Sequence, residues 1–221
     1  MPNEIGFDRY IGLGDSISGD FFPGKTKGAA SQLYSNSPIT PEFRGNDLLT
    51  VNPDCRFYDE TIDGNTSGNL LRLIDSILPP ERSGKTLVTL TIGGNDLVLG
   101  LMNRSEPNNL GIDQTEDNIY RIVDKLQSQY LDLTLVVGTI YDPDNNISGL
   151  IVPDGVSDSI NEFNSRIKAI GDTSEILIGD IYQHFITNSD ATWYIYPYEP
   201  SAIGASEIRR VFLESLQTNH K

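Results

Sequence analysis

The chain is poor in the residues that build disulfides and metal sites. Cysteine occurs once, at Cys55, and histidine twice, at His184 and His220. A lone cysteine excludes an internal disulfide and is consistent with a reducing compartment. The cysteine and the two histidines are scattered along the chain without the spacing of metal ligands. We therefore expect no metal site and no other cofactor, and we expect Cys55 to be a packing residue.

Long apolar segments are also missing. Hydrophobic residues make up 38% of the chain, which is enough for a globular core. No run reaches the roughly 18 apolar residues that a membrane span requires. The segment from Met1 to Asp8 lacks the basic start and apolar stretch of a secretory signal. The sequence therefore predicts a cytoplasmic protein that does not use a membrane as a partner.

Positive charge is scarce. Lysine and arginine total 16 against 31 aspartate and glutamate residues, which gives a formal net charge of −15. Such a surface repels phosphate backbones and anionic lipids, so we expect no nucleic-acid partner. The acidity is spread along the chain and serves solubility, with a mild bias against anionic substrates. It does not predict an oligomeric state.

The length and the pattern of apolar residues predict one α/β domain over residues 1–221. A chain of 221 residues suits a single core. Short apolar runs alternate with helical stripes, as in β-α units around a parallel sheet. The expected strands are Tyr10–Leu13, Arg56–Tyr58, Thr86–Ile92, Leu133–Ile140 and Glu175–Asp180. The expected helices are Leu70–Ile77, Thr115–Tyr130, Val156–Ile170 and Ala202–Leu216.

One long segment, Gly19–Asp47, interrupts this alternation. It is rich in glycine, serine, proline and aromatic residues and has no clear periodicity. In doubly wound sheets, ligands bind beyond the carboxyl ends of the strands. The segment is expected to form a lid or wall over that crevice, and an ordinary long surface loop is the alternative.

Two short motifs follow expected strands. Gly14–Ser18, with the sequence GDSIS, comes directly after the first strand. A small turn there can aim the Ser16 hydroxyl into the crevice, with the next helix placing backbone N–H groups nearby. Gly93–Asp96, with the sequence GGND, ends the central strand. The Asn95 amide there could donate a hydrogen bond to a developing oxyanion. Its alternative role is an Asn-Asp helix cap.

Together with Gly64–Ser67 (GNTS), these motifs resemble the first three signature blocks of SGNH (GDSL-type) hydrolases, in order and along the whole chain. The resemblance implies a three-layer α/β/α fold with a flavodoxin-like, five-stranded parallel sheet. It also implies ester hydrolysis through an acyl-serine. Ser16 would be the nucleophile, with Asp15 as a supporting residue. The backbone N–H groups of Ser16 and Gly64 and the side chain of Asn95 would hold the oxyanion.

The fourth block of that family departs from its pattern here. The family places an aspartate three residues before a histidine, whereas this chain has Tyr196 and Glu199. A carboxylate with an ordinary pKa near about 4.3 is a poor base at neutral pH, unless desolvation raises the value. Glu199 is therefore either a replacement base in aromatic surroundings or a cap of the final helix.

The remaining histidines offer a second source of a base. His184 follows the fifth expected strand, on the edge of the sheet that carries Ser16, and is a candidate supporting residue. A partly buried structural role is its alternative, and Asp190 could orient such a base. His220 stands next to the C-terminus, where order is rare.

These observations leave three hypotheses on one fold. The first is a serine ester hydrolase with a non-standard base, acting on a small-molecule ester or acylated substrate. The second is a catalytically silent relative that binds an acyl, acetylated or carbohydrate ligand. The third is a protein-interaction module that uses Gly19–Asp47 as its contact surface. They differ in whether Ser16 is reactive.

Overall fold

A parallel five-stranded sheet forms the centre of the molecule. The computed structural model describes residues 6–102, 111–142, 156–188, 190–195 and 199–218. Neighbouring strands pair in parallel in the order β2-β1-β3-β4-β5, which confirms the predicted sheet. The strands are β1 (Arg9–Gly14), β2 (Arg56–Thr61), β3 (Lys85–Thr91), β4 (Asp132–Gly138) and β5 (Leu177–Gly179).

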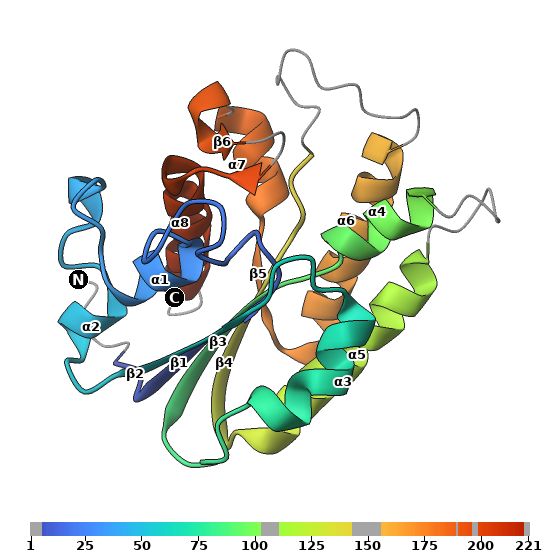
Figure 1. Cartoon of the computed structure of the whole chain (residues 1–221). Helices are drawn as coiled ribbons and strands as arrows, with labels where there is room; N and C mark the ends of the chain where they lie inside the picture. Colours follow the sequence, from blue (N-terminus) through green and yellow to red (C-terminus); the bar gives the residue numbers. More distant parts are fainter. Residues whose placement is uncertain (1–5, 103–110, 143–155, 189, 196–198, 219–221) are drawn as a thin grey trace.

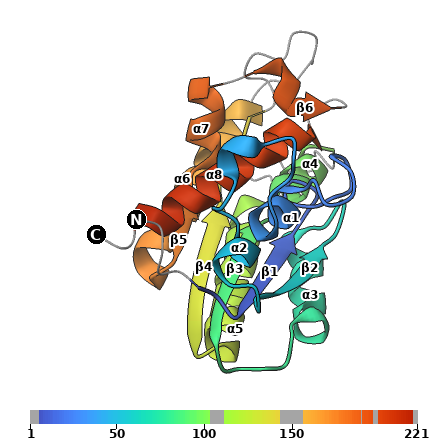
Figure 2. The same cartoon turned by 90° about the vertical axis from the view of Figure 1, so that its left-hand side faces the viewer.

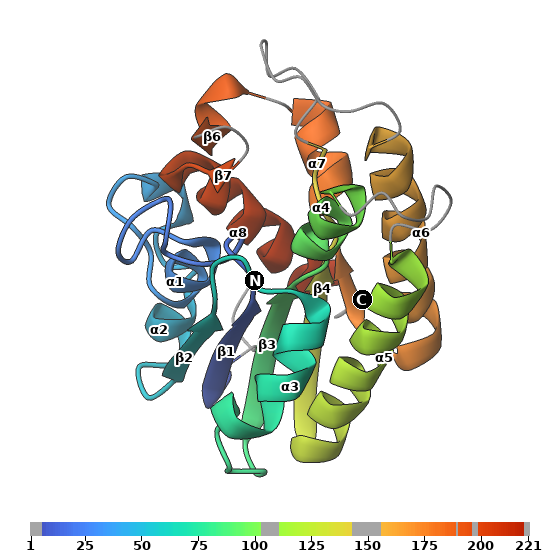
Figure 3. The same cartoon turned by 45° about the vertical axis from the view of Figure 1, so that its right-hand side comes forward.

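Helices cover both faces of this sheet (Figure 1). One layer consists of α1 (Ala29–Tyr34) and α8 (Ala202–Thr218), and α8 runs diagonally across its face of the sheet (Figure 2). The opposite layer consists of α3 (Ser67–Ile77), α5 (Ile112–Gln129) and α6 (Val156–Ser174), which come forward in Figure 3. The arrangement is the predicted three-layer α/β/α fold.

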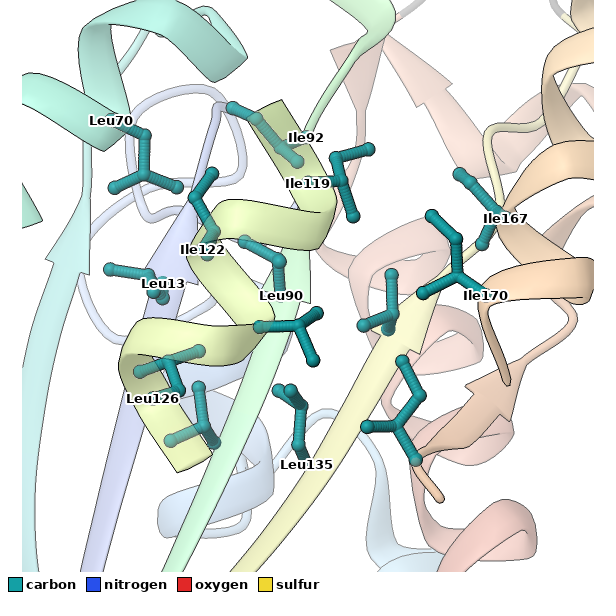
Figure 4. Packing of buried hydrophobic residues seen from close by; sticks show 14 of the residues in the cluster. Leu13, Leu70, Leu90, Ile92, Ile119, Ile122, Leu126, Leu135, Ile167 and Ile170 are labelled. Atoms are coloured by element: carbon teal, nitrogen blue, oxygen red, sulfur yellow. The ribbon is translucent and has the colours of Figure 1, made fainter. Parts of the chain in front are cut away.

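Two hydrophobic clusters hold the layers together, because successive strand residues point to opposite faces. Ile11 and Leu13 of β1 belong to the cluster under α3, α5 and α6. Tyr10 of the same strand belongs to the cluster under α1 and α8, which also contains Cys55. In Figure 4, Leu90 of β3 lies beside Ile122 of α5. Cys55 is a buried free thiol, as expected of a packing residue.

The segment Gly19–Asp47 is more ordered than its composition indicated. It contains α1 and a short 3-10 helix at Pro41–Phe43, and α2 (Leu48–Val51) follows directly. Ala29, Ala30 and Leu33 of α1 are buried in the cluster that α8 shares. The prediction of an irregular region was wrong for this part, because a helix of six residues is too short to show a clear apolar period.

Smaller differences concern the ends of elements. β2 continues to Thr61, three residues beyond its predicted end, whereas β5 is limited to Leu177–Gly179. Besides the helices between Gly19 and Val51, the elements that were not predicted include α4 (Gly94–Met102), α7 (Ile181–Asn188) and a two-stranded hairpin of β6 (Tyr194–Ile195) and β7 (Glu199–Pro200). Within the described ranges, no helix is both long enough and apolar enough to cross a membrane.

The strand order determines where a ligand site lies. The chain passes from β1 to β2 on one side of the sheet, then to β3, β4 and β5 on the other. The order therefore reverses between β1 and β3, and in sheets of this kind the crevice opens beyond the carboxyl ends of those strands. Ser16 follows β1 and Asn95 follows β3, so the fold brings two predicted site motifs to this point.

Candidate active site

The turn after β1 positions Ser16. Gly14 has a φ of +130°, and a Cβ at this position would lie 1.9 Å from the carbonyl oxygen of Thr91 on β3. Asp15 donates its N–H to that same carbonyl at 3.0 Å. Ser16 then starts a turn that the Gly19 N–H closes on the Ser16 carbonyl at 3.3 Å. The next helix begins only at Ala29.

Ser16 opens onto a cavity of about 110 Å³. Asn95 and Glu199 line the same cavity, so three of the predicted site residues meet there. Most of the other lining side chains among the described residues are apolar. They are Ile17, Leu97, Val98, Ile140, Tyr141, Val156 and Ile160, accompanied by Asp15, Gly94 and Ser159.

Glu199 faces Ser16 from the β6–β7 hairpin, where it pairs with Ile195. Both residues line the cavity, and the Ser16 hydroxyl lowers the pKa of the half-buried Glu199 carboxyl. Burial outweighs this effect and raises the pKa of Glu199 to about 7, with a further contribution from the charge of Asp63. At the start of α8, the Ser201 hydroxyl accepts a hydrogen bond from the Gly204 N–H at 3.1 Å. Ser201 therefore caps this helix, a role for which Glu199 was the candidate.

Asp15 adds a second carboxyl group to the cavity wall. Its side chain is only 1% exposed. One oxygen accepts hydrogen bonds from the Thr91 hydroxyl at 2.9 Å and from the Ile17 N–H at 3.2 Å. The other is buried and has no hydrogen-bond partner among the described residues. Burial, against the lowering effect of these two hydrogen bonds and with a smaller increase from the charges of Glu199 and Asp96, raises the pKa of Asp15 to about 7.

Asn95 and Asn65 link the loops after β3 and β2. The Asn95 amide nitrogen donates to the carbonyl of Asn65 at 2.9 Å, which leaves its second N–H for another acceptor. The buried Asn65 side chain in turn donates to the carbonyl of Gly14 at 3.2 Å. Asn65 therefore joins the segment that carries Ser16 to the one that carries Asn95. Asn65 stands in the GNTS motif but was not predicted as a site residue.

Gly64 lies at the exposed surface, with a φ of +69°, and is not among the residues that line the cavity. Asp96 accepts hydrogen bonds from the N–H and the hydroxyl of Ser67 at 2.9 and 2.6 Å. This pair ties α4 to the start of α3. Asp96 therefore holds the first turn of α4, which also contains Asn95, in place.

His184 lies on α7 and is not among the residues that line the cavity with Ser16. Its Nε2 lies 2.8 Å from the Glu207 carboxylate of α8, and its ring stacks on Trp193 with 5.5 Å between centroids. Burial alone would raise the pKa of Glu207, but hydrogen bonds from His184 and Arg210 outweigh it and lower the pKa to about 2. The contacts of His184 match the structural role given as its alternative.

Asp190, another candidate for activating Ser16, is not among the residues that line the cavity. Asp190 is exposed and accepts the Thr192 N–H at 2.8 Å, at the start of the 3-10 helix Ala191–Trp193. Tyr196 and His220 lie outside the described residues. Within the described part of the chain, no three His, Cys, Asp or Glu side chains gather as metal ligands. The cavity therefore combines the hydroxyl group of Ser16, the Glu199 carboxyl group with its raised pKa and the amide donor of Asn95.

Solved structures that resemble this chain include acetyl xylan esterases and a putative GDSL-like lipase. No protein-family model and no curated protein sequence match the chain. Among solved structures, a variant of the acetyl xylan esterase Axe2 from Geobacillus stearothermophilus matches with a TM-score of 0.72 at 17% identity, covering 98% of this chain and 97% of that one. A putative GDSL-like lipase from Parabacteroides merdae matches with a TM-score of 0.71 at 13% identity, covering 97% and 98%.

A third structure, LAE5, is an alpha/beta hydrolase enzyme from the metagenome of Lake Arreo. It matches with a TM-score of 0.70 at 15% identity, covering 95% of this chain and 94% of that one. At such identities the likeness establishes the fold. It confirms the predicted α/β/α architecture with the sheet that SGNH-type hydrolases share.

Proposed function

We propose that the protein hydrolyses carboxylic esters, with Ser16 as nucleophile and Glu199 as general base. One observation carries the proposal: Ser16 and Glu199 line the same cavity, where the Ser16 hydroxyl acts on the pKa of the Glu199 carboxyl. The position of this cavity at the switch point of the sheet supports it. The fold is shared with acetyl xylan esterases and a GDSL-like lipase, which supports the reaction class.

A carboxylate in place of the usual histidine is chemically adequate because of its surroundings. A general base works best when its pKa lies near the working pH. Burial raises the pKa of Glu199 to about 7. The carboxylate is then basic enough to receive the serine proton and is still ionised in a large fraction of molecules at neutral pH.

The proposed reaction has two halves. Glu199 takes the proton from Ser16 Oγ as that oxygen attacks the ester carbonyl. The backbone N–H of Ser16 and the free N–H of the Asn95 amide bind the resulting oxyanion. Glu199 then returns the proton to the departing alcohol, leaving an acyl-serine. In the second half, Glu199 deprotonates a water molecule that attacks the acyl group, and the proton finally returns to Ser16.

The test is hydrolysis of short-chain 4-nitrophenyl esters by wild type, Ser16→Ala and Glu199→Gln. We expect Glu199→Gln to lower kcat/KM by about 10²- to 10⁴-fold, as is typical of losing a general base, and Ser16→Ala to abolish turnover above background. Only wild type should form a mass adduct on Ser16 with a serine-directed phosphonate at an appreciable rate.

Two exposed positions provide matched controls. Ser76→Ala on α3 and Glu162→Gln on α6 repeat the same chemical changes outside the residues that line the cavity, and we expect full activity. Activity that survives Glu199→Gln would remove this residue as the base. Equal rates for wild type and Ser16→Ala would instead favour the binding function that the sequence left open.

A further inference from the structure

Ser16 lies between two hollows of different character. The first is the 110 Å³ cavity described above. The second is a more open groove of about 350 Å³, lined by Ser16, Gly19, Asp20, Phe21, Lys25, Asp59, Thr61 and Asp63. Ser16 is the lining residue that the two have in common. An ester also has two halves, which meet at the carbonyl carbon that a nucleophile attacks.

The cavity suits an apolar group of limited size. Ile17, Val98 and Ile160 represent its mainly aliphatic wall. A cavity of roughly 150 Å³ with such a lining holds benzene, so a 110 Å³ cavity has room for about four carbons. An acetyl group would leave most of this space unfilled. Each added methylene that becomes buried should strengthen binding by about three- to fourfold, until the cavity is full.

The groove has the opposite chemistry. Three carboxylates, from Asp20, Asp59 and Asp63, line it against the single ammonium group of Lys25. Asp20 accepts the N–H groups of Thr26 and Gly28, both at 2.7 Å, which holds its carboxylate in place. Such an arrangement accepts hydrogen bonds from hydroxyl groups and repels anions. The Phe21 ring, 68% exposed, adds an apolar surface beside these groups.

We infer that the substrate is an ester of a fatty acid of about four to six carbons with an alcohol that carries no negative charge. The acyl chain occupies the aliphatic cavity, and the alcohol occupies the acidic groove. This inference rests on the proposed ester hydrolysis at Ser16. It departs from the acetyl esters named for the Axe2 structures, because the cavity beside Ser16 exceeds what acetate fills.

The acyl half is tested with a series of 4-nitrophenyl esters from acetate to decanoate. We expect kcat/KM to peak at butanoate or hexanoate, about tenfold above acetate, and to fall at decanoate. Val98→Trp, which fills the cavity, should remove the preference for the longer acyl chains over acetate. Leu99→Trp is the matched control, since the next residue of α4 is 48% exposed and is not among the lining residues. A maximum at acetate, or no effect of Val98→Trp, would overturn the inference.

A binding measurement separates this inference from the proposed catalysis. Butanamide, titrated into wild type and Ser16→Ala and followed by NMR, should bind both proteins and should not bind Val98→Trp. If butanamide shows this binding pattern while no ester is hydrolysed, the proposed catalysis is wrong, but the assignment of the cavity to an acyl chain is supported. If butanamide binds none of the proteins, the acyl half of the inference is wrong, whatever the esterase result.

The alcohol half is tested with two butanoate esters, of 4-nitrophenol and of 3-carboxy-4-nitrophenol. After correction for their hydroxide-catalysed rates, we expect the uncharged ester to be preferred by at least about fivefold at low salt. Asp63→Asn should narrow this ratio, whereas Asp172→Asn on the exposed surface of α6 should not. Equal hydrolysis of the two esters would overturn the alcohol half.

Discussion

At the scale of single residues, the main question is how a carboxylate comes to face the serine. Glu199 occupies the position of a histidine in the sequence pattern that the chain resembles. Its half-burial makes the charged form costly, which brings its proton affinity close to that of an imidazole. In the proposed mechanism, a glutamate therefore replaces histidine as the base and has a pKa suited to neutral pH.

This leads to a prediction about pH. A base with a pKa raised to about 7 is inactive when protonated, so kcat/KM should rise tenfold per pH unit below pH 7 and level off above it. The measurement is a pH–rate profile with an uncharged ester, corrected for background hydrolysis. The exposed-site variant Glu162→Gln should give the same profile as wild type.

Asp15 modifies that profile. The Glu199 charge raises the pKa of Asp15, and by reciprocity the Asp15 charge raises that of Glu199. In Asp15→Asn the midpoint of the profile should therefore move to lower pH. A wild-type midpoint near 4.5, the ordinary glutamate value, would contradict the role of burial at Glu199.

At the scale of elements, the contact between α8 and the hairpin determines where Glu199 lies. Ser201 donates its N–H to the Trp193 carbonyl at 2.8 Å, just before the helix begins. A Cβ at Gly204, in the first turn of α8, would lie 2.0 Å from that same carbonyl oxygen. Only glycine allows the helix and the hairpin to approach so closely.

We therefore expect Gly204→Ala to destabilise the fold and to lower esterase activity, although alanine is usually favoured over glycine inside helices. The matched control is Gly68→Ala in α3, where the new Cβ would meet its nearest atom at an ordinary 3.6 Å. Gly68→Ala should be as stable as wild type or slightly more stable. Urea denaturation and ester hydrolysis of both variants provide the test. Equal stabilities would show that the hairpin moves away at little cost.

At the scale of the whole molecule, the buried acid at Asp15 makes stability depend on pH. Its pKa is about 7 in the folded protein and 3.8 ordinarily, so the folded state holds a proton that the unfolded state releases. This contribution to stability is complete below pH 3.8 and is lost as pH rises through about 7.

Asp15→Asn should remove that dependence. Between pH 5 and pH 8 the free energy of unfolding of wild type should fall by on the order of 3 kcal/mol more than that of the variant. Urea denaturation at the two pH values measures the difference, and Asp172→Asn, with an exposed carboxyl group, should behave like wild type. If the free energy of unfolding of Asp15→Asn falls between the two pH values by as much as that of wild type, Asp15 is not the source of the pH dependence.

The sequence by itself determined the architecture and the location of the site. Continuous apolar strands such as Thr86–Ile92 require burial on both faces, and only a sheet between two helical layers provides it. Since parallel strands end at one edge, the motifs around Ser16 and Asn95 had to meet there. These results depend on local patterns that repeat along the chain.

Other features were decided only by the tertiary structure. No local pattern shows that Glu199 faces Ser16, that His184 is held by Glu207, or that Asn65 rather than Gly64 links the site loops. The physical reason is that proton affinity and hydrogen bonding depend on groups distant in the chain. Glu199 and Ser16 are far apart in sequence, and they come to line one cavity only once α8 and the hairpin pack against the sheet.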